Sequence, residues 1–394
     1  MDTSLIPADN NLAVMAGLTA IAAAGFLLEK TKFGALLTGT VWTILLAILA
    51  SNLRILPFDA PAYGFVFSYA VPVLIPLFLM KADLKRIFFE TTRMTGAFLL
   101  AAFATLVGVF AAVTLVPLGE WEPAVASSLT GSYVGGSVNF APLTEMTGLA
   151  EGAPSLVSAI VAADHLASAA YLGVLAILPG FAWVANRFIN RDHTQDHTDE
   201  LEEGSQGATT PLSLALTLAY ALTVVALGTW LAVLGDGLVS PEAMRDAIGV
   251  SFGDLKYVFI TLLALILPTA IPGQMAKLNG GFELGVVLAF LFFGAIAAGA
   301  NVAQLLADAP LIMLFIAILV SVHGVVALVL AKFCKLSLPE IIIASNAAIL
   351  GATTAPALAA AKGWRDLVTP GVLVGVLGYA LGTVLGTIVF SLLG

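Results

Sequence analysis

Ten long apolar runs limit this sequence to a membrane-embedded helical fold. A helix needs about 20 mostly apolar residues to span a bilayer. Only 10% of the residues are charged and 60% are hydrophobic, whereas soluble domains carry about 25% charged residues. We therefore expect an all-α integral membrane protein with ten spans, near 12–28, 33–50, 63–80, 95–117, 154–183, 212–234, 257–273, 282–300, 310–331 and 367–392.

Two further apolar segments, 123–147 and 339–361, are interrupted by small and polar residues. The first contains "GSYVGGSVNFAP" and the second contains "SNAAILGATTAP". Backbone groups cannot stay unpaired in lipid, so such a break must be buried in protein or line a watery cavity. Each segment is either a broken helix that crosses the membrane or a hairpin that enters and leaves on one side.

The distribution of basic residues favours hairpins, because basic residues concentrate in cytoplasmic loops. With the N-terminus outside and both segments re-entrant, all of the 16 basic residues except Arg54, Arg245 and Lys256 lie inside. If both segments cross instead, the division falls to ten against six. The first hairpin is thus predicted to enter from outside and the second from inside, with both chain termini outside.

This arrangement gives two halves, each with five spans and one hairpin before the fifth span. An odd number of spans per half forces opposite orientations, and the halves match weakly at an offset of 216 residues. For example, Pro123 pairs with Pro339 and Gly135 with Gly351. We expect an inverted repeat with halves 1–185 and 211–394, joined by an acidic cytoplasmic linker, 186–210. Such repeats are typical of secondary transporters.

The hairpin tips are the predicted binding site for substrate and ion. Where one half-helix ends and the next begins, carbonyl oxygens suit a cation and free N–H groups suit an anion. The competing interpretation is that the small residues only allow close helix packing, which is how we interpret the glycines of 371–386. The candidate residues in the two tips are Thr130, Ser132, Gly135, Gly136, Ser137, Asn139, Ser345, Asn346, Gly351, Thr353 and Thr354.

Asp164 is the main ionisable candidate inside a span. A carboxylate in the membrane is costly and is usually functional. Asp164, Ser168 and Tyr171 share a helical face, so Asp164 is a possible Na⁺ ligand together with carbonyl groups of the hairpin tips. The alternatives are that Asp164 carries a proton, pairs with a cationic group of the substrate, or makes a structural hydrogen bond to another helix. We expect His165 and His323 to pack or hydrogen-bond rather than to couple transport.

Other function classes leave no trace in the sequence. The single cysteine, Cys334, excludes a disulfide framework. No nucleotide-binding or zinc motif is present, so we expect no enzyme, no cofactor beyond a coupling Na⁺ or H⁺, and no nucleic-acid partner.

Several stretches together resemble the YjcL-like family of bacterial membrane proteins, long regarded as a domain of unknown function. They include "FVFSYAVPVLIPLFLMKADLKRI", "LTGSYVGGSVNFAPL", "ASNAAILGATTAPALAAAKGW" and "LVTPGVLVGVLGYALGT". The family more distantly resembles sodium–glutamate symporters and the sodium–bile-acid-symporter and cation–proton-antiporter fold group. The resemblance implies panel and core domains, a homodimer in the bacterial inner membrane, and ion-coupled elevator-type transport.

Three functional hypotheses follow. The first is Na⁺-coupled symport of a small organic anion, amino acid or short peptide. The second is a cation/proton antiporter that uses Asp164. The third is a membrane sensor or scaffold that transports nothing, for which the longest loop, the linker 186–210, offers little output surface.

Overall fold

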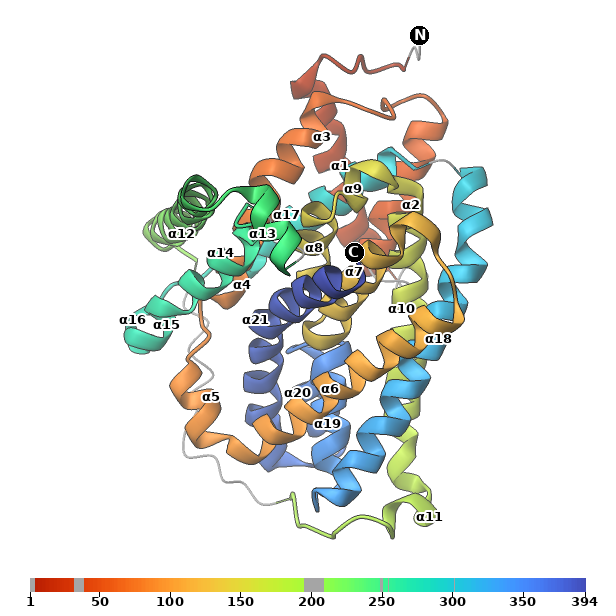
Figure 1. Ribbon diagram of the computed structural model, residues 1–394, viewed down its shortest axis with the longest axis vertical. Helices are drawn as coiled ribbons and strands as arrows, with labels where there is room; N and C mark the ends of the chain where they lie inside the picture. Colours follow the sequence, from red (N-terminus) through yellow and green to blue (C-terminus); the bar gives the residue numbers. More distant parts are fainter. Residues whose placement is uncertain (1–3, 32–38, 195–208, 249–250, 254, 301) are drawn as a thin grey trace.

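The computed structural model describes residues 4–31, 39–194, 209–248, 251–253, 255–300 and 302–394, and this part of the chain is helical (Figure 1). The helices before the linker are α1 (Asn11–Glu29), α2 (Gly39–Asn52), α3 (Pro61–Phe65), α4 (Val71–Leu79), α5 (Leu84–Glu90), α6 (Thr92–Leu115), α7 (Glu122–Gly135), α8 (Phe140–Met146), α9 (Leu149–Gly152), α10 (Pro154–Ile177) and α11 (Ala182–Ala185). Those after it are α12 (Pro211–Leu238), α13 (Pro241–Ile248), α14 (Lys256–Ala264), α15 (Ile266–Ala270), α16 (Pro272–Met275), α17 (Gly281–Ala298), α18 (Val302–Phe333), α19 (Leu338–Ile349), α20 (Thr354–Ala361) and α21 (Val368–Leu393).

Within the described residues, eight helical stretches are long and apolar enough to cross a membrane, so the chain is an all-α integral membrane protein. They match eight of the ten predicted spans. The other two predicted spans, 33–50 and 257–273, coincide with shorter apolar helices, Gly39–Asn52 and Lys256–Ala270. Residues 33–38 of the first lie outside the described part of the chain, so the total of ten spans stays a prediction.

The first interrupted segment is a hairpin, which we call hairpin 1 (122–146). It consists of α7 and the short α8, and the chain breaks between them at Gly136, whose φ of +71° is a conformation that favours glycine. The two ends of the hairpin lie together, because a Cβ atom added to Gly152 would come within 2.2 Å of the indole ring of Trp121. The segment therefore returns to the end of the molecule at which it entered.

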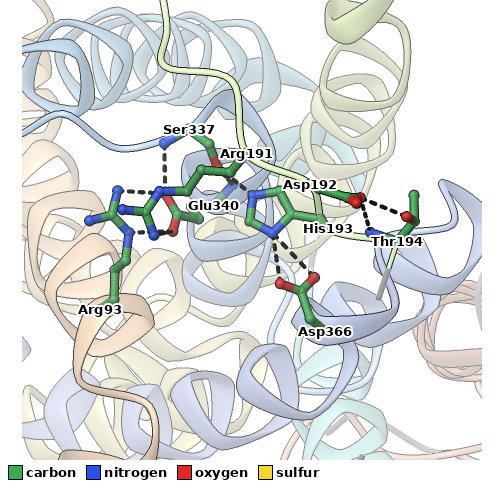
Figure 2. A network of polar contacts seen from close by, with 8 residues as sticks. All are labelled: Arg93, Arg191, Asp192, His193, Thr194, Ser337, Glu340 and Asp366. Carbon is green, nitrogen blue, oxygen red and sulfur yellow. Dashed lines mark hydrogen bonds and ion pairs between the residues drawn. The ribbon is translucent and has the colours of Figure 1, made fainter. Parts of the chain in front are cut away.

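The second interrupted segment has the same form, and we call it hairpin 2 (338–361). Helix α19 begins with a capping box between Ser337 and Glu340, and the break before α20 contains Gly351 at a φ of +89°. His193 joins the two ends of this hairpin: its Nε2 atom is 2.8 Å from Ser337 Oγ and its Nδ1 atom is 2.9 Å from the Asp366 carboxylate. Figure 2 shows His193 between these two residues.

The hairpins enter from opposite ends of α6. At the start of this helix, Arg93 is ion-paired with Glu340 of hairpin 2, and the end of the helix leads through residues 116–121 into hairpin 1. A helix of 24 residues is about 36 Å long. The entrances are therefore separated by roughly the thickness of a bilayer. The inverted relation of the two halves and the division at 186–210 stay predictions.

Helix α21 supports both hairpins through its row of glycines. The Gly378 Cα lies against the carbonyl group of Val134 and the Gly375 Cα lies against the backbone of Ala352, so that added Cβ atoms would sit 2.6 and 2.4 Å from these neighbours. The prediction that this glycine row serves packing is confirmed. It brings the broken backbones of both hairpins close to the single helix α21 (Figure 1).

The Arg93–Glu340 pair fixes the base of hairpin 2. Arg93 Nη2 donates to Glu340 Oε2 at 3.1 Å (Figure 2). The same nitrogen donates to the Lys335 carbonyl group at 2.6 Å. The Glu340 side chain is almost fully buried, so loss of Arg93 leaves its charge with only the Ser337 N–H and the more distant Arg191, 3.8 Å away. We expect Arg93→Gln to destabilise the protein by about 1–3 kcal/mol, reduced from the buried limit because Arg93 itself is partly exposed.

A thermal or denaturant melt in detergent measures this effect. Lys332→Gln is the matched control, since Lys332 is exposed near the same end of the molecule. An Arg93→Gln protein that melts together with this control would show that the pair adds no stability.

Candidate functional site

The tips of the two hairpins touch each other. The backbone N–H of Gly136 donates to the carbonyl group of Ala348 at 3.3 Å, and a Cβ atom on Gly136 would lie 3.3 Å from the Gly351 Cα. Two breaks that are about 215 residues apart in sequence thus meet at one point. Since Gly136 and Gly351 both have positive φ values, any larger residue at either position meets backbone strain, and at Gly136 it also meets crowding.

A cavity of about 270 Å³ opens where the tips meet, and we call it the central cavity. Hairpin residues Ser137 and Thr353 line it, and both side chains are exposed. The opposite wall is aromatic and comes from α4, α17 and α21, with side chains of Phe78, Phe282, Phe290, Phe293 and Tyr379. The cavity therefore presents two hydroxyl groups on one side and aromatic faces on the other.

A separate polar cluster, which we call the Asp164 cluster, lies behind the tip of hairpin 1. Asp164 on α10 is only 7% exposed. Its two carboxylate oxygens accept from Ser132 Oγ at 3.1 Å and from Ser168 Oγ at 3.2 Å. The hydroxyl group of Tyr133 is buried beside Asp164 and Ser168, but it meets neither of them in good hydrogen-bond geometry.

This cluster has the chemistry of a site for a hard cation. A carboxylate and three hydroxyl oxygens are the ligand types that such cations prefer. The Tyr133 hydroxyl makes no well-formed hydrogen bond to these neighbours, so it is available to a further ligand, since buried polar groups are normally bonded. Ser132 of this cluster and Gly136 of the tip both belong to hairpin 1, so the same segment contacts the cluster and lines the central cavity.

A chain of hydrogen bonds connects the two hairpins through His323. Thr105 Oγ lies 2.9 Å from both the Tyr133 carbonyl oxygen and His323 Nδ1, and His323 Nε2 lies 2.7 Å from Ser345 Oγ. Ser345 Oγ is also 2.7 Å from the Tyr171 hydroxyl group. Thr105 has one proton and donates it to the carbonyl oxygen, so it accepts from Nδ1–H, and Nε2 accepts from Ser345. A neutral His323 satisfies every bond.

The structure separates the predicted site residues into groups. Thr130 Oγ donates within its own helix to Ala126, and Asn139 is held by α21, where it donates to the Gly378 carbonyl group at 3.2 Å and accepts from Thr383. Gly135 also lies against α21. These residues build the hairpin and do not line the central cavity.

The remaining candidates of hairpin 2 lie near its tip. Thr354 Oγ donates to Asn346 Oδ1 at 2.6 Å, while Asn346 Nδ2 is buried without a partner. Gly351 and Thr353 line the central cavity. Ser345 instead faces a second, apolar cavity between α10, α18 and α19.

Two further polar residues lie outside these groups. Asp83 caps α5 by accepting from the backbone N–H groups of Lys85 and Arg86. His165 contacts the Val161 carbonyl group of its own helix. Neither Tyr133 nor the aromatic wall could be predicted from the sequence, because an aromatic residue that lines a cavity looks the same in an apolar helix as one that faces lipid.

Glu145, in α8 near the base of hairpin 1, makes the free energy of unfolding depend on pH. Burial, and less strongly the charge of Glu151, raise the pKa of Glu145 to about 7, while Lys256 opposes the shift. The folded state therefore binds this proton more tightly than the unfolded state, so stability falls as pH rises from the unfolded pKa of about 4.5 through 7. Above pH 7 Glu145 is ionised in the folded state, and the full loss of stability is present.

We expect Glu145→Gln to remove this loss. The variant should match the wild-type thermal midpoint at pH 4.5 and exceed it by a growing margin up to pH 7 and beyond. Glu120→Gln, at an exposed position outside the same hairpin, serves as the control. Parallel curves for the wild type and Glu145→Gln would mean that Glu145 titrates normally.

Comparison with known proteins adds a family but no activity. The family described as "Protein of unknown function (DUF819)" matches residues 16–393. The "Uncharacterized membrane protein YjcL" of Bacillus subtilis (strain 168) is 30% identical over 389 residues, which cover 95% of each chain. The chain therefore belongs to the DUF819 family of membrane proteins, which includes YjcL.

Proposed function

We propose that this protein is a cation-coupled secondary transporter in the bacterial inner membrane, and that it is neither an enzyme nor cofactor-dependent. The observation that carries the proposal is the contact between two hairpin tips that enter from opposite ends of α6. Broken helices that meet in this way place a binding site between the two sides of a membrane. The expected reaction is symport of Na⁺ with a small organic anion or amino acid.

The division of labour follows from the two sites. The Asp164 cluster binds the cation, and the central cavity binds the solute. Ser132 connects the two sites, because it contacts Asp164 directly and lies one helical turn before the tip of hairpin 1. Cation binding orders the end of α7, and this order favours solute binding at the tip.

The packing of the helices supports a moving unit and a fixed unit. The hairpins pack on α6, α10, α18 and α21, whereas α1, α2, α4, α12, α14 and α17 pack largely on one another. The central cavity lies between these two groups of helices. We take the first group as the core domain and the second as the panel domain, with the panel domain forming a homodimer and with both termini outside the cell.

Ligand-dependent stability tests this proposal. The purified protein is melted with and without Na⁺, at several pH values, and against a set of carboxylates, amino acids and dipeptides. A ligand that binds only the folded state raises its stability, so Na⁺ and one solute should stabilise more together than the sum of each alone. Stabilisation by Na⁺ and pH with no effect of any solute favours a cation/proton antiporter. No effect of any ion favours a sensor or scaffold.

A further inference from the structure

The start of the linker between the two halves lies against the base of hairpin 2, and we call residues 189–193 the strap. Ile189 forms a parallel backbone bridge with Ser337, the residue that caps α19. Arg191 Nη1 lies 3.8 Å from Glu340 Oε1, and Figure 2 shows Arg191 beside this carboxylate. The strap therefore contacts the first turn of hairpin 2 through both its backbone and its side chains.

His193, the last residue of the strap, connects the two ends of hairpin 2. Its Nε2 atom lies 2.8 Å from Ser337 Oγ, before α19, and its Nδ1 atom lies 2.9 Å from the Asp366 carboxylate, after α20. These two partners lie 144 and 173 residues beyond His193 in the sequence. The ends of hairpin 1, by contrast, contact each other directly through Trp121 and Gly152. A segment from outside the hairpin thus holds the ends of hairpin 2 together.

The contacts of the strap can break at low cost. The side chains of Arg191 and Asp366 are 45% and 20% exposed, so water can replace their partners. Glu340 is almost fully buried, but its ion pair with Arg93 of α6 does not involve the strap and remains when the strap leaves. Ion pairs that water reaches add little net stability. These properties suit a reversible contact better than a permanent one.

The strap also has space beside it. A cavity of about 580 Å³ lies between strap residues 191–193, the start of α6 and the start of α21. Its lining includes Arg93, Glu340 and Asp366, the charged groups that lie around the strap in Figure 2. A polar cavity of this size can hold water, so the groups that release of the strap uncovers can be solvated at once.

We propose that the strap is a latch for hairpin 2, and that it must detach before this hairpin opens a path to the central cavity from the side at which it enters. The inference rests on the proposed transport function, because it gives hairpin 2 the role of the gate on that side. Detachment frees α20 and the residues that lead into α21. The tip at Gly351 can then move away from Gly136 of hairpin 1.

A thiol at the tip of hairpin 2 reports on this step in the full chain. Thr353 is exposed and lines the central cavity, so Thr353→Cys in a Cys334→Ser background is labelled with a membrane-impermeant maleimide in vesicles of both orientations. In inverted vesicles, we expect His193→Ala to raise the labelling rate about 10-fold or more, as for loss of one hydrogen bond to a charged group. The rate in right-side-out vesicles should not rise.

The two orientations separate a latch from a general loosening of the fold. Inverted vesicles expose the cytoplasmic face, from which hairpin 2 is predicted to enter. An equal rise on both faces would mean that His193→Ala only loosens the protein, and an unchanged rate on both faces would mean that the strap holds nothing. Either result overturns the inference.

A second variant tests the contact itself. Asp366→Asn weakens the bond to His193 from the other side, and it should also raise the rate in inverted vesicles. Because residues in contact act non-additively, the double variant should be no faster than His193→Ala alone. Asn190→Ala, at an exposed position within the strap, is the matched control and should label like its parent. Additive effects of the two substitutions, or a control as fast as His193→Ala, overturn the inference.

Failure of this inference is distinguishable from failure of the proposed function. If Na⁺ changes the labelling rates of the protein with an intact strap but His193→Ala changes neither rate, the strap is not a latch and cation-coupled transport stands. If Na⁺ changes no rate in any variant, cation coupling is contradicted. In that case a faster rate for His193→Ala in inverted vesicles alone still supports the latch.

Discussion

Asp164→Asn is expected to abolish the stabilisation of this protein by Na⁺. The substitution keeps a side chain that can hydrogen-bond to Ser132 and Ser168, but it removes the only carboxylate of the cluster. At a Na⁺ concentration 100-fold above the dissociation constant, binding contributes about 2.7 kcal/mol. That contribution should fall to near zero in the variant, while its stability without Na⁺ changes much less.

Titration of the thermal midpoint with NaCl, at constant ionic strength in choline chloride, measures the effect. Asp83→Asn is the matched control, since Asp83 caps α5 and does not belong to the cluster. Ser132→Ala should give an intermediate response because one oxygen ligand is lost. An Asp164→Asn protein with the full wild-type response to Na⁺ would show that Asp164 is structural.

Gly136→Ala is expected to destabilise the protein and to remove its solute response. Gly136 has φ +71° and ψ 176°, a region that side chains strongly disfavour at a cost of about 1–3 kcal/mol. The added Cβ atom would also lie 3.3 Å from the Gly351 Cα. Because both hairpin tips must shift to accommodate it, the geometry of the central cavity changes.

The thermal midpoint, with and without a solute that stabilises the wild type in Na⁺, measures both consequences. Gly173→Ala is the matched control: Gly173 lies within the helix α10 and a Cβ atom there meets nothing within 4 Å. Alanine should be neutral or slightly stabilising at that position. If Gly136→Ala behaves like Gly173→Ala, the tips are not in tight contact.

The hairpins could be predicted from the sequence because particular residue types mark them. Proline at the start of each long half-helix, glycine at each break and the distribution of basic residues all point to the same arrangement. Both Gly135 and Gly136 are predicted tip residues, and Gly136 is the one that has the positive φ value opposite Gly351, whereas the repeat match pairs Gly135 with Gly351. Gly135 is the last residue of α7 and provides space for α21.

The chemistry of the site was only partly accessible. Asp164 and Ser168 share a face by helical spacing, but the partnership of Asp164 with Ser132 depends on how α10 packs against hairpin 1. Thr130 and Asn139 are residue types that often bind ligands. In this structure the Thr130 side chain instead donates to the backbone of its own helix, and the Asn139 side chain donates to the backbone of α21. The aromatic wall of the central cavity could not be separated from lipid-facing aromatics without the fold.

Alternating access of the central cavity is the central claim, and a single thiol at Thr353 tests it most directly. Cys334 is the one native cysteine, so Thr353→Cys in a Cys334→Ser background carries only that thiol. A membrane-impermeant maleimide is applied to right-side-out and inverted vesicles, with and without Na⁺. The account predicts that Na⁺ changes the labelling rates from the two faces in opposite directions. Labelling from one face only, at a rate that Na⁺ does not change, would contradict it.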